Sequence, residues 1–191
     1  MSSLDQDFEE LRQRIKQGCG LRNIGDDPLY YLIFRPEEML DVKRHMKQWT
    51  AKLALDGWKV HTLSMADAIH NIIKNNDLRE IWLESEKENP LDFDAINRTL
   101  SDALTADDAL KQVVLEKMQE VANISNGLLL ITDLEALHPY MRIGSIEQKL
   151  QGKIKVTTII LYPGKRTGRT TLKFLGIYQE DGNYRSIHIG G

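Results

Sequence analysis

The segment LYYLIF, residues 29–34, is an unbroken apolar run of strand length. A half-exposed strand alternates apolar and polar residues, whereas a strand covered on both faces reads as a continuous apolar run. Two later segments, LLLIT at 128–132 and VTTIIL at 156–161, also have the length and composition of strands. These runs predict the central strands of a sheet with helices on both faces.

The segments between these runs have helical periodicity. Apolar residues recur at steps of three and four in 4–15 and again in 39–53. Pro36 and the two glutamates after it suit the first turn of the second helix. Short runs at 172–175 and 186–189 then follow with only turns between them. This order predicts an α/β fold, a three-layer sandwich with a mostly parallel sheet and antiparallel carboxyl-terminal strands.

The length of 191 residues predicts a single α/β domain over 1–191. Helical patterns without a strand fill about 77–123, which we interpret as a helical insertion. From Asp77 to Glu120 there are twelve acidic and five basic residues, whereas Pro139 to Lys173 holds one acidic and eight basic residues. Such polarity can steer an acidic partner or nucleic acid, or it can be a solvated surface that is basic on one side.

Several classes of protein are disfavoured by composition. Cys19 is the single cysteine, which excludes an internal disulfide and a cysteine-cluster metal site. The five histidines are scattered without metal-ligand spacing, so we expect no metal and no cofactor. No apolar run approaches the roughly 18 residues of a membrane span, and the acidic amino terminus is unlike a signal peptide. We expect a cytoplasmic protein without a membrane partner.

The segment YPGKRTGRTT, residues 162–171, raises the question of a phosphate-binding loop. Such a loop has four residues between its glycines and a lysine after the second, and it precedes a helix. Here three residues separate Gly164 from Gly168, Arg169 replaces the lysine, and a predicted strand follows. We therefore interpret this segment as a strand end and a basic turn.

The other parts of a nucleotide site are equally incomplete. Asp133 ends an apolar strand, as the acid of a Walker B motif does. The first strand, however, is followed by RPEE at 35–38, which lacks glycine and whose two carboxylates would repel a triphosphate. We predict a domain that resembles a P-loop-type domain without its phosphate loop. A degenerate nucleotide-binding, ATPase-like domain that uses Asp133 is one alternative.

Polar and aromatic residues cluster near the ends of the predicted strands. In an open α/β sheet, ligands gather at the carboxyl ends of the strands, so Asp133, Arg142 and Tyr162 are expected to be neighbours, with Arg185 near them. This group is either a polar site for a partner or an anionic ligand, or an internal ion pair with tyrosines at the sheet rim. The candidate binding residues are Asp133, His138, Pro139, Arg142, Tyr162, Pro163, Gly164, Tyr184 and Arg185.

A second set of candidates is basic. A hairpin tip rich in cations can lie along a phosphate backbone. Against this reading, the net charge of the chain is −3, and aromatic residues are not interleaved with the bases. A nucleic-acid-binding subunit is therefore a further alternative, with four candidate residues: Lys165, Arg166, Arg169 and Lys173.

Taken in this order, the carboxyl-terminal segments resemble the BrxB family of the bacteriophage exclusion (BREX) systems of bacteria and archaea. The segments are LLLITDLEALHPYMR, TTIILYPG, TLKFLGIY and NYRSIHI, and residues 27–60 give a weaker match. The family-typical positions, which carry no assigned chemistry, are Pro139, Arg142, Tyr162, Pro163, Gly164, Gly176, Tyr184 and Arg185.

The resemblance implies a small cytoplasmic subunit of an anti-phage system, with no catalytic activity assigned to the family. Such systems also contain PglZ, which is a protein of the phosphatase superfamily, a large ATPase called BrxC, and a DNA methyltransferase. The resemblance implies a PglZ-like protein as the direct partner, with a BrxC-like ATPase or other BREX subunits as further partners. We therefore predict a non-catalytic adaptor subunit.

Overall fold

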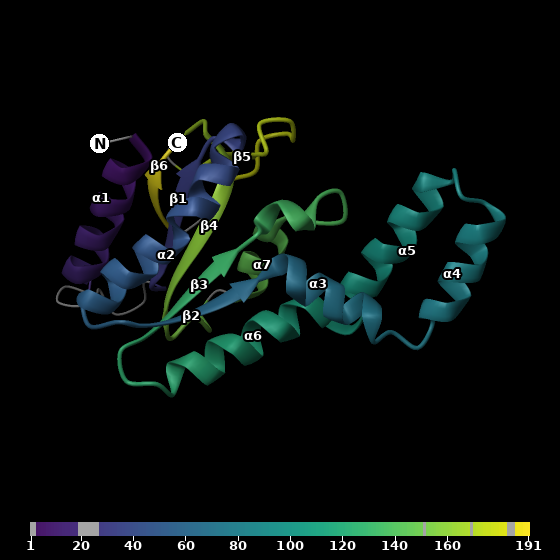
Figure 1. Ribbon diagram of the computed structural model, residues 1–191, viewed down its shortest axis with the longest axis horizontal. Coiled ribbons are helices and arrows are strands. Elements are labelled where there is room, and N and C mark those ends of the chain that lie inside the picture. Colours follow the sequence, from purple (N-terminus) through teal and green to yellow (C-terminus); the bar gives the residue numbers. More distant parts are fainter. Residues whose placement is uncertain (1–2, 19–26, 151, 169, 183–185) are drawn as a thin grey trace.

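The computed structural model describes residues 3–18, 27–150, 152–168, 170–182 and 186–191 (Figure 1). Its centre is a six-stranded sheet with the order β2-β3-β4-β1-β6, in which β5 pairs with β4. The strands are β1 (Leu29–Phe34), β2 (Lys59–Ser64), β3 (Gly127–Thr132), β4 (Thr157–Arg166), β5 (Leu172–Phe174) and β6 (Ile187–Gly190).

The pairing of the strands confirms the predicted α/β fold with a mostly parallel sheet. The pairs β2·β3, β3·β4, β4·β1 and β1·β6 are all parallel. Among the described strands, antiparallel pairing is confined to β5, which pairs with the end of β4. The last strand reverses the direction of β5, as the intervening turns suggest, but its hydrogen-bonding partner is β1. It therefore extends the parallel sheet at the edge beyond β1.

Helices cover both faces of this sheet, which confirms the three layers. All residues of β1 and β3 are buried, as their unbroken apolar sequences predict. Tyr30 and Leu32 of β1 face one apolar core, whereas Tyr31 and Ile33 face the other. The first core is covered by α1 (Ser3–Gly18) and α2 (Met39–Leu55), and the second by α3 (Met65–Lys74), α6 (Ala109–Ala122) and α7 (Ile143–Leu150).

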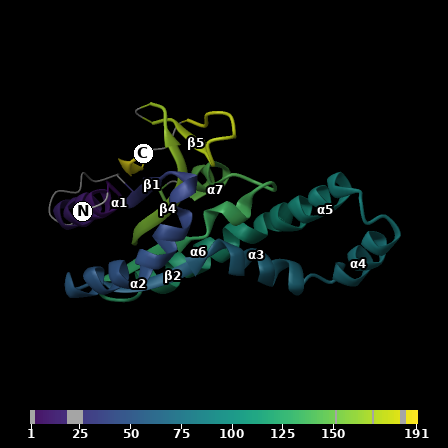
Figure 2. The ribbon, with the colours of Figure 1, turned by 45° about the horizontal axis from the view of Figure 1, so that its top comes forward.

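The stretch interpreted as a helical insertion contains helices of two kinds. Helix α6 packs its buried side chains into the second core and so belongs to a layer of the sandwich. Helices α4 (Arg79–Glu88) and α5 (Phe93–Thr105) instead extend away from the sheet as a hairpin (Figures 1 and 2). We call residues 78–105 the arm.

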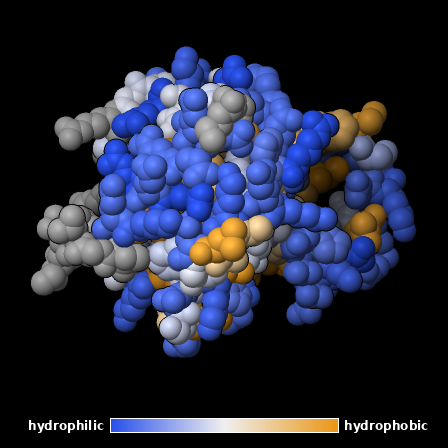
Figure 3. All heavy atoms as spheres, turned by 60° about the vertical axis from the view of Figure 1, so that its left-hand side comes forward, coloured by the Kyte–Doolittle hydropathy of each residue, from blue (hydrophilic) through white to orange (hydrophobic). Residues whose placement is uncertain are grey.

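The arm is poorly covered by the rest of the chain. No residue of α4 is buried, although all of its residues are described, and in α5 the buried residues are Ala103 and Leu104. Apolar residues are visible on the arm at the right of Figure 3, around a hollow in the surface.

Among the described helices, none has both the length and the apolar character that crossing a membrane requires.

A buried hydrogen bond fastens α7 to the central strand. The Tyr31 hydroxyl donates to Oε2 of Glu147 at 2.6 Å, and Glu147 is only 5% exposed. A buried carboxylate is tolerated only where polar partners replace its lost hydration. The Tyr31 hydroxyl therefore fixes α7 over β1.

We predict that Tyr31→Phe lowers the free energy of unfolding by about 1–3 kcal/mol, because a donor to a buried carboxylate is lost while the ring remains. Urea denaturation at neutral pH measures the change. Leu55→Ala, which alters an 87% exposed side chain at the end of α2, serves as the control and should change stability little. Equal unfolding midpoints for Tyr31→Phe and the unaltered protein would contradict this account.

Candidate functional site

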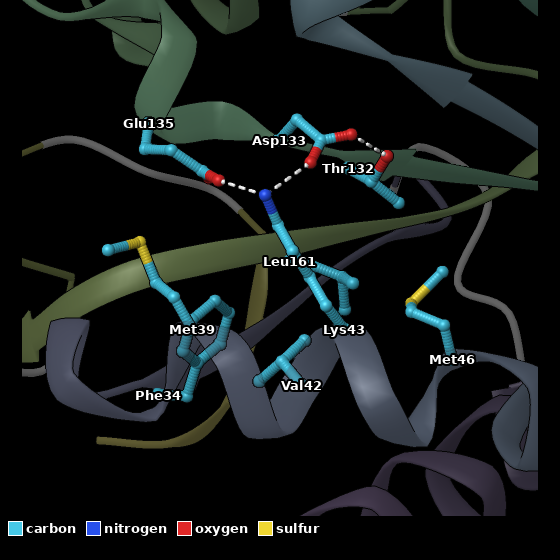
Figure 4. A pocket seen from close by; sticks show the side chains of 9 residues that line it. All are labelled: Phe34, Met39, Val42, Lys43, Met46, Thr132, Asp133, Glu135 and Leu161. Atoms are coloured by element: carbon cyan, nitrogen blue, oxygen red, sulfur yellow. Dashed lines mark hydrogen bonds and ion pairs between the residues drawn. The ribbon is translucent and has the colours of Figure 1, made fainter.

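A lysine forms ion pairs with two carboxylates at the carboxyl-terminal edge of the sheet. Nζ of Lys43, on α2, lies 3.0 Å from Oδ1 of Asp133 and 2.9 Å from Oε1 of Glu135 (Figure 4). Asp133 directly follows β3 with φ 56° and ψ 41°, and Glu135 lies in the short helix η3 (Leu134–Leu137). The Thr132 hydroxyl donates to the other oxygen of Asp133 at 2.9 Å. Asp133 therefore already has a cation and a hydroxyl as partners.

A cavity of about 190 Å³ lies beside this bridge, between α2, the ends of β1 and β3, and the middle of β4 (Figure 4). Its polar end is formed by Lys43, Thr132, Asp133 and Glu135. The remaining lining is apolar and consists of Phe34, Met39, Val42, Met46 and Leu161. A cavity of this size and lining can hold a few small groups, but its one cation is already paired with two carboxylates of the same chain, which leaves that end negatively charged.

The protonation of Asp133 follows from these contacts. Burial alone would raise its pKa, but hydrogen bonds from Ser64, Lys43 and Thr132 and the charge of Lys43 lower the pKa below the ordinary value. The carboxylate is therefore stable as an anion and a poor proton acceptor.

Along the described ranges, this edge included, no group of three His, Cys, Asp or Glu side chains is arranged to hold a metal ion.

Charged groups of the connection from β1 to α2 are also paired internally. In a P-loop domain the first strand is followed by backbone amides that bind phosphate. Here the Glu38 carboxylate accepts hydrogen bonds from the Arg35 backbone amide at 3.0 Å and from the Arg35 guanidinium at 2.9 Å. The guanidinium bond is the main cause of the lowered pKa of Glu38. Donors that could meet a phosphate are thus occupied by a carboxylate of the same chain.

A second group of candidates meets around Tyr178. The Arg142 guanidinium lies 4.9 Å from the centre of the Tyr178 ring, and Nδ1 of His138 is hydrogen-bonded to the Tyr178 hydroxyl. Burial raises the pKa of Tyr178, and the nearby Arg142 charge partly offsets that increase. Cation–aromatic contacts of this kind hold side chains in place. Arg142 and His138 thus brace the turn after β5.

The residues that the sequence predicted to be neighbours, Asp133, Arg142 and Tyr162, have different contact partners. Asp133 has Lys43 as its charged partner, whereas Arg142 packs on Tyr178. Tyr162 is a buried core residue whose ring centre lies 5.6 Å from that of Tyr31 and 5.5 Å from that of Phe174. Sequence order placed these side chains at one edge, but their contacts separate them.

The remaining candidates have structural surroundings of their own. Pro139 follows a cis peptide bond from His138. Pro163 is buried in β4, and a Cβ atom on Gly164 would lie 2.4 Å from the Lys173 carbonyl oxygen. That close approach of β5 requires glycine. Four residues singled out from the sequence lie outside the described residues: Cys19, Arg169, Tyr184 and Arg185.

The hairpin of β4 and β5, which we call the basic hairpin, places two lysines opposite one another. Lys165 on β4 is the direct cross-strand partner of Lys173 on β5. Lys165 and Arg166 are exposed, and Nε of Arg166 donates to the Gly168 carbonyl oxygen at 3.1 Å. Like charges directly opposite one another destabilise a strand pair. An anion beside the two lysines would relieve this repulsion.

Sequence reasoning missed Lys43, Glu135 and Tyr178. A signal for Lys43 was present, because it lies four residues after Met39 and three before Met46 and so borders the apolar face of α2. No comparable signal marks Tyr178, whose position depends on the tertiary packing of the turn after β5.

We predict that Asp133→Asn destabilises the protein only where the carboxylate is charged. Because the folded state lowers the pKa of Asp133, its stabilising contribution is present above the unfolded value of about 3.9 and is lost as the pH falls through the folded value. The expected loss near neutral pH is roughly 1 kcal/mol, since solvent screens the half-exposed Lys43.

Thermal unfolding of Asp133→Asn and of the unaltered protein, near neutral pH and at about pH 2, measures this difference in stability. The two melting temperatures should converge in acid. A gap of the same size at both pH values would contradict a charge-dependent role for Asp133.

Comparison with known proteins gives one family. The family model for BREX protein BrxB matches residues 61–189, which includes β3, β4, β5 and the arm, four of the six residues of β2 and all but the last residue of β6. The match leaves α1, β1 and α2 outside its bounds. No curated protein and no solved structure matches the chain.

Proposed function

Because this chain belongs to the BrxB family of BREX phage-defence proteins, we propose that it is a non-catalytic adaptor subunit whose arm docks a PglZ-like protein. The family implies a component of a multi-subunit BREX system, so other BREX subunits are plausible partners. The adaptor role and the choice of partner are the proposal.

The observation that carries this proposal is the exposed apolar surface of the arm. Four of its apolar side chains are more than half exposed: Leu78, Ile81, Leu91 and Phe93. Apolar residues that gather on one projecting element are typical of a protein–protein interface. The arm also lies within the range that matches the family.

The sheet edge supports the non-catalytic part of the proposal. Asp133, which occupies the place of a Walker B acid, is bridged to Glu135 by Lys43. Glu38 binds the Arg35 amide at the turn where a phosphate loop would lie. A nucleotide would have to displace both internal contacts and approach three carboxylates, which opposes the degenerate ATPase alternative.

The proposal predicts that the chain, co-expressed with a PglZ-like protein of a BREX system, elutes as a stable complex in size-exclusion chromatography with light scattering. Phe93→Glu should weaken the complex at least about tenfold, or roughly 1.4 kcal/mol, because it places a charge in the apolar interface. Leu55→Glu, at an even more exposed apolar position far from the arm, should leave the complex intact. A chain that elutes alone would count against the adaptor role.

Nucleic-acid binding is a second candidate, which the Lys165–Lys173 pair favours. Two adjacent ammonium groups can release counterions from a phosphate backbone, so the binding should weaken steeply with salt. This candidate predicts a gel shift of duplex DNA at low salt that Lys165→Glu/Lys173→Glu abolishes. Lys47→Glu/Lys74→Glu, which alters two exposed lysines on α2 and α3, is the charge-matched control. If the unaltered protein gives no shift at low salt, this candidate is wrong.

A further inference from the structure

The arm contains a groove between α4 and α5 with a volume of about 460 Å³. Trp82 is the largest side chain in its lining, and Ile73 from the end of α3 extends the groove towards the body of the protein. Besides Ala95, the apolar lining consists of six larger side chains: Ile73, Ile81, Trp82, Leu83, Ile96 and Leu100. None of these six side chains is buried, so the groove remains accessible.

The form of the groove fits a helix. Two adjacent helices present a furrow into which a third helix packs its side-chain ridges, which gives a three-helix bundle. Helix α4 has ten residues and is therefore about 15 Å long. A partner helix with apolar residues at steps of three and four over about ten residues would cover the lining.

The charge of the arm selects the partner. Residues 78–105 hold seven acidic and three basic side chains. Glu86 and Asp92 line the groove, and Arg79, the one cation in its lining, is ion-paired with Glu80 at 2.8 Å. A helix whose polar face carried glutamates would be repelled here, whereas lysines and arginines would be attracted.

We propose that the groove between α4 and α5 binds a basic amphipathic helix of a partner protein. The inference rests on the proposed role of the arm as a docking surface, and it adds the chemistry of the docked segment. Apolar residues of the partner helix fill the groove around Trp82, and its cations face the acidic rim.

The test uses the full chain and two synthetic peptides of about 18 residues, long enough to hold helical structure on binding. Both peptides carry leucine on one helical face, and the other face carries lysine in one peptide and glutamate in the other. Calorimetry should detect binding of the lysine peptide and at least tenfold weaker binding of the glutamate peptide. Trp82 should report the same event, so a binding-dependent change in fluorescence should disappear in Trp82→Phe.

Variants locate the binding. Ile81→Glu changes a 61% exposed side chain in the groove and should lower the affinity for the lysine peptide at least tenfold. Leu55→Glu should not. Each variant adds one negative charge, which by itself would strengthen a non-specific attraction to lysine. A loss of affinity confined to Ile81→Glu therefore reports the groove.

Several outcomes would overturn the inference: no binding of the lysine peptide, equal binding of both peptides, or binding that Ile81→Glu leaves unchanged. A homodimer of the chain that Ile81→Glu converts to a monomer would also overturn it, because a second copy would then occupy the groove. A stable complex with the PglZ-like protein and no peptide binding would refute the helix while the adaptor role stands. Peptide binding without that complex would support the helix and count against the PglZ-like partner.

Discussion

The fold depends on one constraint, which is that the central strands have no polar face. Every residue of β1 and β3 is buried, so the sheet requires a helical layer on each side. Helices α1 and α2 supply one layer, and α3, α6 and α7 supply the other. Helices α4 and α5 extend away from the sheet instead of covering it. The same constraint that closes the sandwich therefore leaves the arm with exposed apolar side chains.

A sheet of this kind gathers functional groups at the carboxyl ends of its strands, and here those groups pair with one another. Lys43 is ion-paired with both Asp133 and Glu135, and Arg35 is ion-paired with Glu38. These contacts are internal to the chain and favour a stable rim over a phosphate site. The sheet then supports the two candidate docking surfaces, which are the arm and the hairpin of β4 and β5.

The sequence predicts the strands and most helices well, because local periodicity and unbroken apolar runs reflect burial directly. LYYLIF and LLLIT become β1 and β3, and the helical layers follow from the spacing of the apolar residues. The pairing of β6 with β1 could not be derived, since local turns indicate the direction of a strand but not its hydrogen-bonding partner. The packing of α6 against the sheet could not be derived either, because α4, α5 and α6 have similar patterns of apolar residues in the sequence.

The site was harder to predict than the fold. Lys43 and Asp133 are ninety positions apart and meet only because α2 packs on the face of the sheet formed by β1, β3 and β4. Arg142 was expected beside Asp133 on the basis of strand order, but its guanidinium stacks on Tyr178 instead. Strand order locates an edge of the sheet, whereas the partners of long side chains at that edge depend on the tertiary path of the intervening turns.

Hydrogen exchange of the backbone amides, compared between the chain alone and its complex with the PglZ-like protein, tests the central claim most directly. If the arm is the docking surface, exchange should slow across residues 79–105, where α4 and α5 are poorly covered in the isolated chain. Exchange at the sheet edge, residues 133–142, should not change. Protection of that edge or of the hairpin at 164–173, with the arm unaffected, would contradict the account.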